Sequence, residues 1–162
     1  MTIFFTADQH LGHANIIKYC DRPFANTEAM DAVIINRWNY RVSYRDEVYV
    51  LGDFTMRANL HDHYISQLNG KKHFIPGGHD HAKIDYMDPI VELKTKLGWL
   101  ILSHYPLEEW NRQFYGAIHL HGHVHNLNFR QIPHRINVGV DLWDFYPVSY
   151  EEIVDKDLTT VL

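Results

Sequence analysis

The N-terminal stretch of the chain decides its fold, and it reads TIFFTADQH over residues 2–10. An apolar run at residues 2–7 leads directly into Asp8 and His10. Short apolar runs rich in aromatic and β-branched residues are typical of buried strands. The sequence therefore predicts a strand whose carboxyl end presents an acid and an imidazole.

The same arrangement recurs four times along the chain. Further apolar runs occupy residues 48–51, 73–76, 99–102 and 117–120. They lead into Gly52-Asp53, Gly77-Gly78-His79-Asp80, the isolated His104 and Gly122-His123-Val124-His125. Ligands of α/β proteins gather in the crevice beyond the carboxyl ends of strands. We therefore expect five strand-end turns to bring Asp and His side chains together in one metal site.

Strands and helices are expected to alternate in the first half of the chain, whereas the second half is richer in strands that pair with one another. A short helix is expected at residues 14–20. A longer one is expected to begin at Asn26 or Thr27, with Met30, Val33, Ile34 and Trp38 on one face. A third is expected around Leu60, Tyr64, Ile65 and Leu68, and Asn69-Gly70 ends it. A hairpin of residues 90–96 and 99–102 around Leu97-Gly98 precedes strands at 118–120, 136–138 and 147–149 and a helical turn at 150–155. This order indicates an α/β fold of two sheets packed face to face with helices outside.

Composition limits the class of protein. At 162 residues with 46% hydrophobic and 22% charged content, residues 1–162 are expected to form a single domain. The net charge of −5 argues against an extended nucleic-acid surface, although bound divalent metals would add positive charge at the site. The single Cys20 excludes an intramolecular disulfide and a thiolate metal cage. With no signal peptide or membrane-spanning run in the sequence, we expect a cytoplasmic protein.

The donor set indicates the kind of metal. Asp and His without sulfur favour Mn, Fe, Co, Ni or Zn over Ca or a sulfur cluster. Two such ions about 3.5–4 Å apart clamp the attacking and leaving oxygens of an in-line displacement. The motifs therefore predict a dinuclear divalent-metal centre for phosphoryl chemistry.

The ordered motifs resemble those of the calcineurin-like metallophosphoesterase family, which carries D-x-H, G-D, G-N-H-[DE], H and G-H-x-H. The likeness runs from Asp8 to His125 and is to the small stand-alone prokaryotic and phage phosphoesterases. It implies a four-layer α/β/β/α sandwich of two packed mixed sheets flanked by helices. It also implies hydrolysis of a phosphoester bond, with a phosphodiester favoured, by a metal-bridging hydroxide.

The resemblance assigns roles by position. Asp8, His10 and His125 resemble ligands of the first metal, His104 and His123 resemble ligands of the second, and Asp53 resembles the carboxylate shared by both. His79 resembles the histidine that holds the phosphate and protonates the leaving alkoxide as a general acid. The expected cofactors are thus two divalent ions (Mn, Fe, Ni or Zn), and the expected substrate is a small phosphoester, with a nucleotide-derived one as an option.

Gly78 departs from the family pattern. It stands where an Asn side-chain oxygen ligates the second metal, and glycine supplies no such oxygen. Water fills the place, the second site is weak, or the centre is mononuclear. The change favours one alternative function, a non-catalytic scaffold of the kind seen in a retromer subunit. A nuclease acting on oligonucleotides is a further alternative, whereas the sequence after Asp53 lacks the Val-Asp-Arg-Gly segment of protein phosphatases.

Several neighbours are open to two interpretations. His13, Arg22 and Gly78 are candidate substrate-binding residues, but a polar contact at a helix start for His13 and a salt bridge for Arg22 are also expected. His119 and His121 alternate along one strand, and we expect them to be hydrogen-bonded behind the ligands. An aromatic cluster of Trp143, Phe145 and Tyr146 is expected in the core, with stacking on a nucleoside as the alternative.

Overall fold

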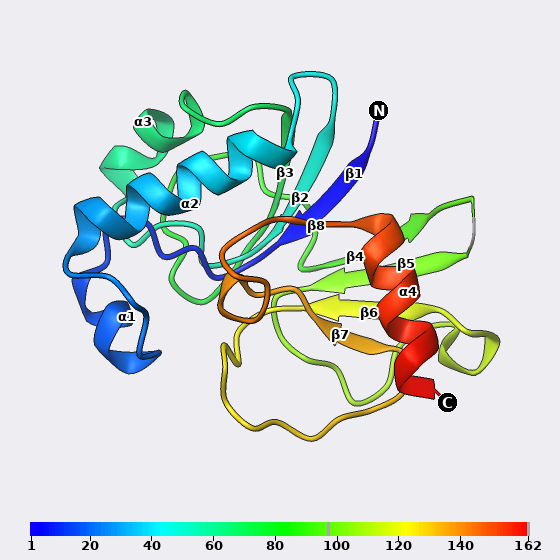
Figure 1. Cartoon of the computed structure of the whole chain (residues 1–162). Coiled ribbons are helices and arrows are strands. Elements are labelled where there is room, and N and C mark those ends of the chain that lie inside the picture. Colours follow the sequence, from blue (N-terminus) through cyan, green and yellow to red (C-terminus); the bar gives the residue numbers. More distant parts are fainter. Residues whose placement is uncertain (97, 162) are drawn as a thin grey trace.

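Two four-stranded sheets form the centre of the computed structural model, which describes residues 1–96 and 98–161 (Figure 1). Leu97 of the expected hairpin turn lies outside the described residues. The first half contains β1 (Ile3–Thr6), α1 (Ala14–Tyr19), α2 (Thr27–Arg41), β2 (Glu47–Leu51), α3 (His61–Ile65) and β3 (Lys71–Ile75). The second half contains β4 (Ile90–Lys94), β5 (Trp99–Ser103), β6 (Ile118–His121), β7 (Arg135–Asn137), β8 (Val148–Ser149) and α4 (Tyr150–Val161).

Both sheets are mixed. The first has the order β3-β2-β1-β8, with β1, β2 and β3 parallel and β8 antiparallel to β1. The second has the order β4-β5-β6-β7, with β5, β6 and β7 parallel and β4 antiparallel to β5. Figure 1 shows α1, α2 and α3 on one side of the molecule and α4 on the other. The expected sandwich of two mixed sheets flanked by helices is confirmed.

The alternation of side chains along each strand separates two apolar layers. Between the sheets, Phe5 and Leu51 of the first sheet lie in the same core cluster as Leu100 and Leu120 of the second. On the other face of the first sheet, buried Phe4, Val48 and Val50 pack in one cluster with Met30, Ile34 and Trp38 of α2. The predicted apolar face of α2 is thereby confirmed, with Val33 only partly buried.

Helix boundaries follow local hydrogen bonding. The side chain of Asn26 accepts a bond of 2.9 Å from the backbone N–H of Ala29, which caps α2 as expected. The third helix is shorter than predicted, because after Ser66 the bonds change to i→i+3, from Gln67 to Tyr64 and from Leu68 to Ile65. This tightening ends the α-helix one turn early.

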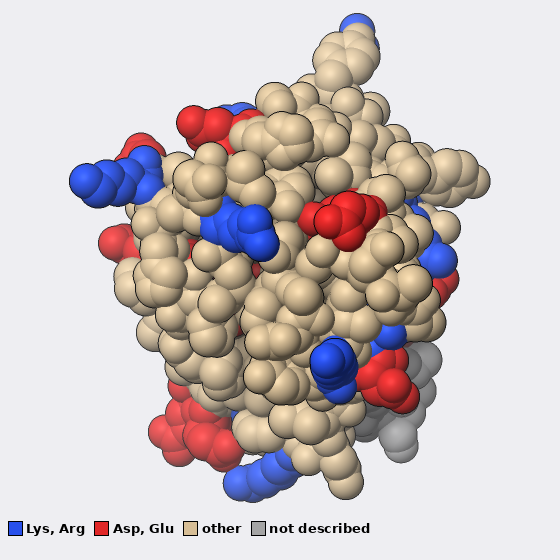
Figure 2. All heavy atoms as spheres, turned by 90° about the vertical axis from the view of Figure 1, so that its left-hand side faces the viewer, with Lys and Arg blue, Asp and Glu red and all other residues tan. Residues whose placement is uncertain are grey.

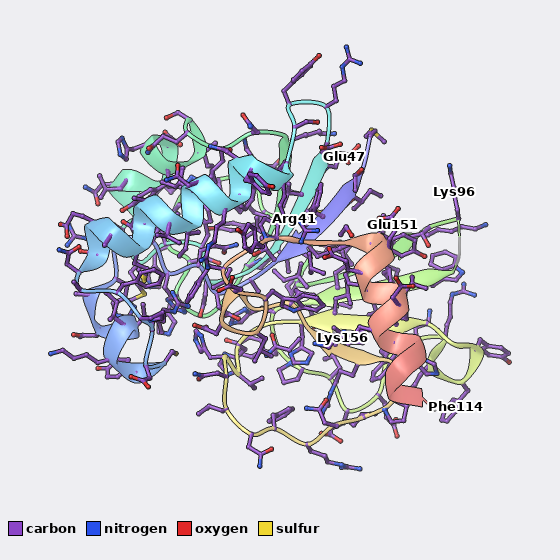
Figure 3. All side chains as sticks on the ribbon, in the orientation of Figure 1. Arg41, Glu47, Lys96, Phe114, Glu151 and Lys156 are labelled. Carbon is purple, nitrogen blue, oxygen red and sulfur yellow. The ribbon has the colours of Figure 1, made fainter. Side chains whose placement is uncertain are left out.

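The C-terminal helix closes the edge of both sheets. It is longer than the predicted turn at 150–155, and its Ile153 is fully buried in the core between the sheets. Arg41, labelled in Figure 3, reaches from the end of α2 to the Pro147 carbonyl at 3.0 Å and to Glu152 at 2.7 Å. This bond and ion pair join α2 to the start of α4. None of the described helices is long and apolar enough to cross a membrane.

Candidate metal centre

The predicted ligands stand on an unusual backbone. All six follow the carboxyl ends of strands, and all but His104 have a left-handed conformation. The φ angles are 60° at Asp8, 51° at His10, 55° at Asp53, 71° at His123 and 49° at His125. Such a conformation costs a non-glycine residue on the order of 1–3 kcal/mol and clusters at functional sites. Five strained residues in one place indicate that these loops are shaped for a task other than stability.

Asp53 lies between two histidines from different sheets. Its Oδ2 is 3.4 Å from His10 Nε2 and 3.5 Å from His104 Nε2, and all three side chains are buried. Within the described residues, both ring nitrogens of His10 and Nε2 of His104 have no hydrogen-bond partner. Buried polar atoms without partners are rare in native proteins. Their convergence on one carboxylate fits two divalent metal ions that share it. Each ion would then give the nitrogens that lack a hydrogen bond a partner to ligate.

The donors form two overlapping groups. Asp8, His10 and His125 offer atoms within 4.8 Å of one another, and so do Asp8, Asp53 and His104. The first group contains the three residues that resemble the first-metal ligands. The second contains Asp53 and His104 together with Asp8. His123, which resembles a second-metal ligand, is exposed and stands outside this group, with its ring 5.1 Å from that of His104.

Hydrogen bonds orient the histidine rings. His104 Nδ1 contacts the Leu51 carbonyl at 2.9 Å, so this nitrogen carries the proton and Nε2 is free for a cation. His125 Nδ1 contacts Asp141 Oδ2 at 2.8 Å in the same way. The sequence analysis assigned no role to Asp141, because no local pattern marks its contact with His125.

Two glycines make room for the acidic and imidazole groups. A Cβ at Gly122 would lie 2.5 Å from Asp8 Oδ2, and a Cβ at Gly52 would lie 2.5 Å from His104 Nδ1. Gly52 also has a φ of 83°, which side chains rarely adopt. Glycine is therefore required at both positions, because a larger residue would clash with Asp8 or His104.

Burial controls the charges of the free site. It raises the pKa of Asp8 to about 6 and lowers that of His10 to about 2, which keeps the His10 ring neutral and ready to ligate. Burial also acts to lower the pKa of His125, but the hydrogen bond to Asp141 and the charge of Asp8 raise it to about 10. In the metal-free protein, the proton on His125 therefore compensates part of the negative charge of the buried carboxylates, as a bound cation would.

Asp80 fixes two ligand loops to each other. Its Oδ2 accepts bonds from the backbone N–H groups of Asp53 at 2.8 Å and Gly77 at 2.9 Å, and its Oδ1 accepts one from Phe54 at 3.0 Å. The backbone N–H of His79 in turn donates to Asp53 Oδ1 at 2.9 Å. The sequence signal for Asp80 was its place directly after His79, but its role needed the contact between the loops after β2 and β3.

Arg22 is a structural residue of the site rather than a substrate contact. Its side chain is fully buried, and its Nε donates to Asp141 at 2.7 Å. Its remaining N–H groups donate to the backbone carbonyls of Asp8 at 2.7 Å and Gln9 at 2.9 Å. The salt-bridge interpretation of Arg22 therefore agrees with the structure, and the substrate-binding interpretation does not.

A pocket of about 250 Å³ opens beside the first-metal residues. It is lined by His10, His13, Ile16, Tyr19, Cys20, His79, His125 and Leu127. The structure thus brings His13 and His79 to the pocket, with the His79 side chain exposed. Gly78 is also exposed, and its backbone faces the Tyr105 hydroxyl.

A larger hollow of about 660 Å³ lies at the opposite end of the strands, near Lys96 and Glu151 (Figure 3). It contains none of the motif residues. On the face that Figure 2 shows, Lys and Arg side chains are scattered among the described residues and form no broad patch.

The other histidines and aromatic residues lie behind the site. His119 contacts the Ile101 carbonyl at 2.9 Å through Nδ1 and accepts from the Leu107 N–H at 3.0 Å. His121 contacts the Gly122 carbonyl at 2.8 Å. Phe145 is buried in the core and Trp143 packs against the core between the sheets, so the core interpretation agrees with the structure for these two residues. Tyr146 is only partly buried, and its ring lies 6.4 Å from that of the exposed Tyr40.

The chain has sequence relatives in an archaeon and in a mycobacteriophage. No family model matches the chain. It is 37% identical to an uncharacterized protein of Methanocaldococcus jannaschii, covering 94% of this chain and 89% of that protein. It is 29% identical to the gene 66 protein of Mycobacterium phage D29, covering 91% of this chain and 92% of that protein.

Two solved structures share the fold. A protein of unknown function from Aquifex aeolicus is 26% identical with a TM-score of 0.77, covering 96% of this chain and 98% of that one. Vps29 of Entamoeba histolytica in complex with zinc is 17% identical with a TM-score of 0.50, covering 86% and 73%. The chain therefore shares the fold of these structures, and its five motifs resemble, in their order, those of the calcineurin-like metallophosphoesterase family.

Proposed function

We propose that the protein is a metal-dependent phosphoesterase that prefers phosphodiesters. The observation that carries the proposal is the position of Asp53, whose Oδ2 lies 3.4 Å from His10 Nε2 and 3.5 Å from His104 Nε2. Within the described residues, neither of these two Nε2 atoms has a hydrogen-bond partner, and a buried carboxylate between two such nitrogens suits a shared pair of cations. The zinc complex of Entamoeba Vps29 supports a divalent ion on this fold.

Each residue of the site has a distinct task in this proposal. Asp8, His10 and His125 would hold one ion, His104 and His123 would hold the other, and Asp53 would be available to both. Bound Mn, Fe, Ni or Zn supplies Lewis acidity toward the phosphate oxygens and the attacking water. His79 stands at the pocket beside His10, with the ring centroids 5.7 Å apart. From there it binds the phosphate and donates a proton to the departing oxygen.

The pocket supports a diester over a monoester. Its wall includes Ile16, Tyr19 and Leu127, and none of the described residues that line it is Lys or Arg. A terminal phosphate carries two negative charges and benefits from basic side chains, whereas a diester carries one and brings a second organic group. The apolar wall suits that group, and a nucleoside is one candidate for it.

The test is an assay of metal-stripped protein on bis-p-nitrophenyl phosphate, alone and with Mn²⁺, Ni²⁺ or Zn²⁺, while bound metal is counted. We expect turnover that depends on metal, close to two ions per chain, and slower hydrolysis of p-nitrophenyl phosphate. Asp53→Asn is the matched variant, because it keeps the shape of the side chain and removes the shared charge. Bound metal without turnover on either ester would favour the scaffold alternative that Gly78 raises.

A further inference from the structure

The space beside Gly78 is occupied by another side chain. A Cβ built at Gly78 would lie 2.9 Å from the Tyr105 hydroxyl oxygen. The amide oxygen of an asparagine is only two bonds beyond its Cβ. The Tyr105 hydroxyl therefore lies in the volume that the amide of an asparagine at position 78 would fill.

Tyr105 also packs on both histidines that resemble ligands of the second metal. Its ring centroid lies 4.8 Å from that of His104 and 4.6 Å from that of His123, edge to face in both cases. Ser103 Oγ donates to the Tyr105 carbonyl at 2.7 Å, which holds the backbone at this position. Tyr105 is 48% exposed, so this residue lies partly at the surface of the site.

The donor set is short of one ligand at the same place. His104 Nε2 is buried without a partner among the described residues, and Gly78 contributes no oxygen. A phenol oxygen is a hard donor, and together with imidazole and carboxylate it suits Mn, Fe or Zn. Tyr105 and Gly78 come from loops after different strands, β5 and β3, so only the tertiary structure places them together.

We propose that the Tyr105 hydroxyl supplies, in place of the missing asparagine amide, the oxygen ligand of the second metal ion. The proposal rests on the metal centre of the proposed function. It assigns a ligand that none of the five motifs contains. It also explains how the loop after β3 can carry glycine at position 78 without leaving the second metal ion one ligand short.

The first experiment is a calorimetric titration of metal-stripped protein with Zn²⁺ or Mn²⁺, comparing the unmodified chain with Tyr105→Phe. Phenylalanine keeps the ring contacts on His104 and His123 and removes only the hydroxyl. We expect the second binding step to weaken by at least about tenfold, as loss of even an indirect metal contact does, while the first step stays unchanged. Tyr115→Phe is the control, because Tyr115 is 92% exposed and lies outside the site.

Two further measurements separate a ligand from a merely structural residue. Adding Gly78→Asn to Tyr105→Phe should restore the second step, because the vacated volume then holds an amide oxygen. In the ultraviolet difference spectrum, a tyrosine signal should follow the second equivalent of metal in the unmodified chain and in Tyr115→Phe, and be absent in Tyr105→Phe.

The outcomes are distinct. An unchanged second step in Tyr105→Phe overturns the assignment, and so does an unmodified chain that binds one ion only. Failure of Gly78→Asn to restore binding overturns the replacement of amide by phenol. Two ions with the expected Tyr105 dependence but no ester hydrolysis would overturn the proposed function and leave the ligand assignment standing.

Discussion

At the scale of single residues, the candidate ligand residues have two tasks. They adopt the left-handed conformation of the turns, and they supply the donor atoms of the site. Asp and His tolerate left-handed φ angles better than branched or bulky residues do. The turns after β1, β2 and β6 need that conformation, and their φ values run from 49° at His125 to 71° at His123. Replacing any of these residues with a β-branched one would therefore disturb both the turn and the donor.

His79 gives the sharpest prediction on turnover. His79→Ala should keep metal binding and fold, because its backbone bond to Asp53 remains, and lose about 10²–10⁴-fold in turnover through loss of the proton donor. Steady-state kinetics on bis-p-nitrophenyl phosphate with counted metal measures this. His63→Ala, at an exposed position on α3, is the control. Unchanged turnover in His79→Ala would remove this residue from the mechanism.

His119 gives a prediction on stability. Burial lowers its pKa from 6.5 to about 4, although the hydrogen bond to the Ile101 carbonyl acts to raise it. The unfolded chain thus takes up a proton below pH 6.5 that the folded chain takes up only below about 4. This contribution is present in full above pH 6.5 and is lost as pH falls toward 4, on the order of 3 kcal/mol.

Urea unfolding of metal-free protein across this pH range measures the effect. The free energy of unfolding of His119→Gln should fall less steeply with decreasing pH than that of the unmodified chain. His63→Gln should follow the unmodified chain. Parallel curves for all three proteins would show that His119 does not carry this dependence.

At the scale of elements, the site depends on how strand-end loops are tied together. Asp80 joins the loops after β2 and β3, and Arg22 joins the loop after β1 to Asp141 after β7. Backbone N–H groups that lose a buried acceptor cost about 1–3 kcal/mol. The hydrogen bonds of Asp80 and Arg22 therefore hold the candidate ligands in position, although neither residue is itself a candidate ligand.

Asp80→Asn tests the tie between β2 and β3. Its amide has one acceptor oxygen in place of two, so it cannot satisfy the N–H groups of both Asp53 and Phe54. We expect a loss of about 1–3 kcal/mol in the free energy of unfolding, together with weaker metal binding. Asp88→Asn, at an exposed position, is the control for removing a charge. Equal stability of the two variants would show that the tie is dispensable.

At the scale of the whole molecule, we expect metal binding and folding to be coupled. The centre is assembled from loops of both sheets, so the unfolded chain contains no preformed site. An ion at about 100 times its dissociation constant adds about 2.7 kcal/mol to the stability. For a chain of this size, that corresponds to a rise in Tm of roughly 5–10 °C.

Thermal unfolding with and without Mn²⁺ or Zn²⁺ measures this coupling. The rise should shrink in Asp53→Asn, which removes the carboxylate that, in the proposed function, both ions would share. Addition of a chelator to the loaded protein should return the Tm to the metal-free value. A Tm that is the same with and without metal would contradict a centre built across the two sheets.

The amino-acid sequence by itself determined much of this protein. Apolar runs followed by Asp or His predicted the strands and the loops after them, because buried strands need continuous apolar composition and their ends can carry polar groups. The periodic face of α2 and its Asn26 cap were equally local signals. The order of the five motifs indicated a resemblance to the calcineurin-like metallophosphoesterases and seven candidate residues.

Only the tertiary structure decided what those residues meet. Asp80, Asp141 and Tyr105 act across loops from different strands, and no local pattern marks a contact between segments far apart in sequence. Arg22 could have been a substrate contact or a salt bridge, and its complete burial beside Asp141 decided for the salt bridge. Local composition fixes which side chains are available, whereas packing of the two sheets fixes which of them share a volume, as the Tyr105 hydroxyl and the place of a side chain at Gly78 do.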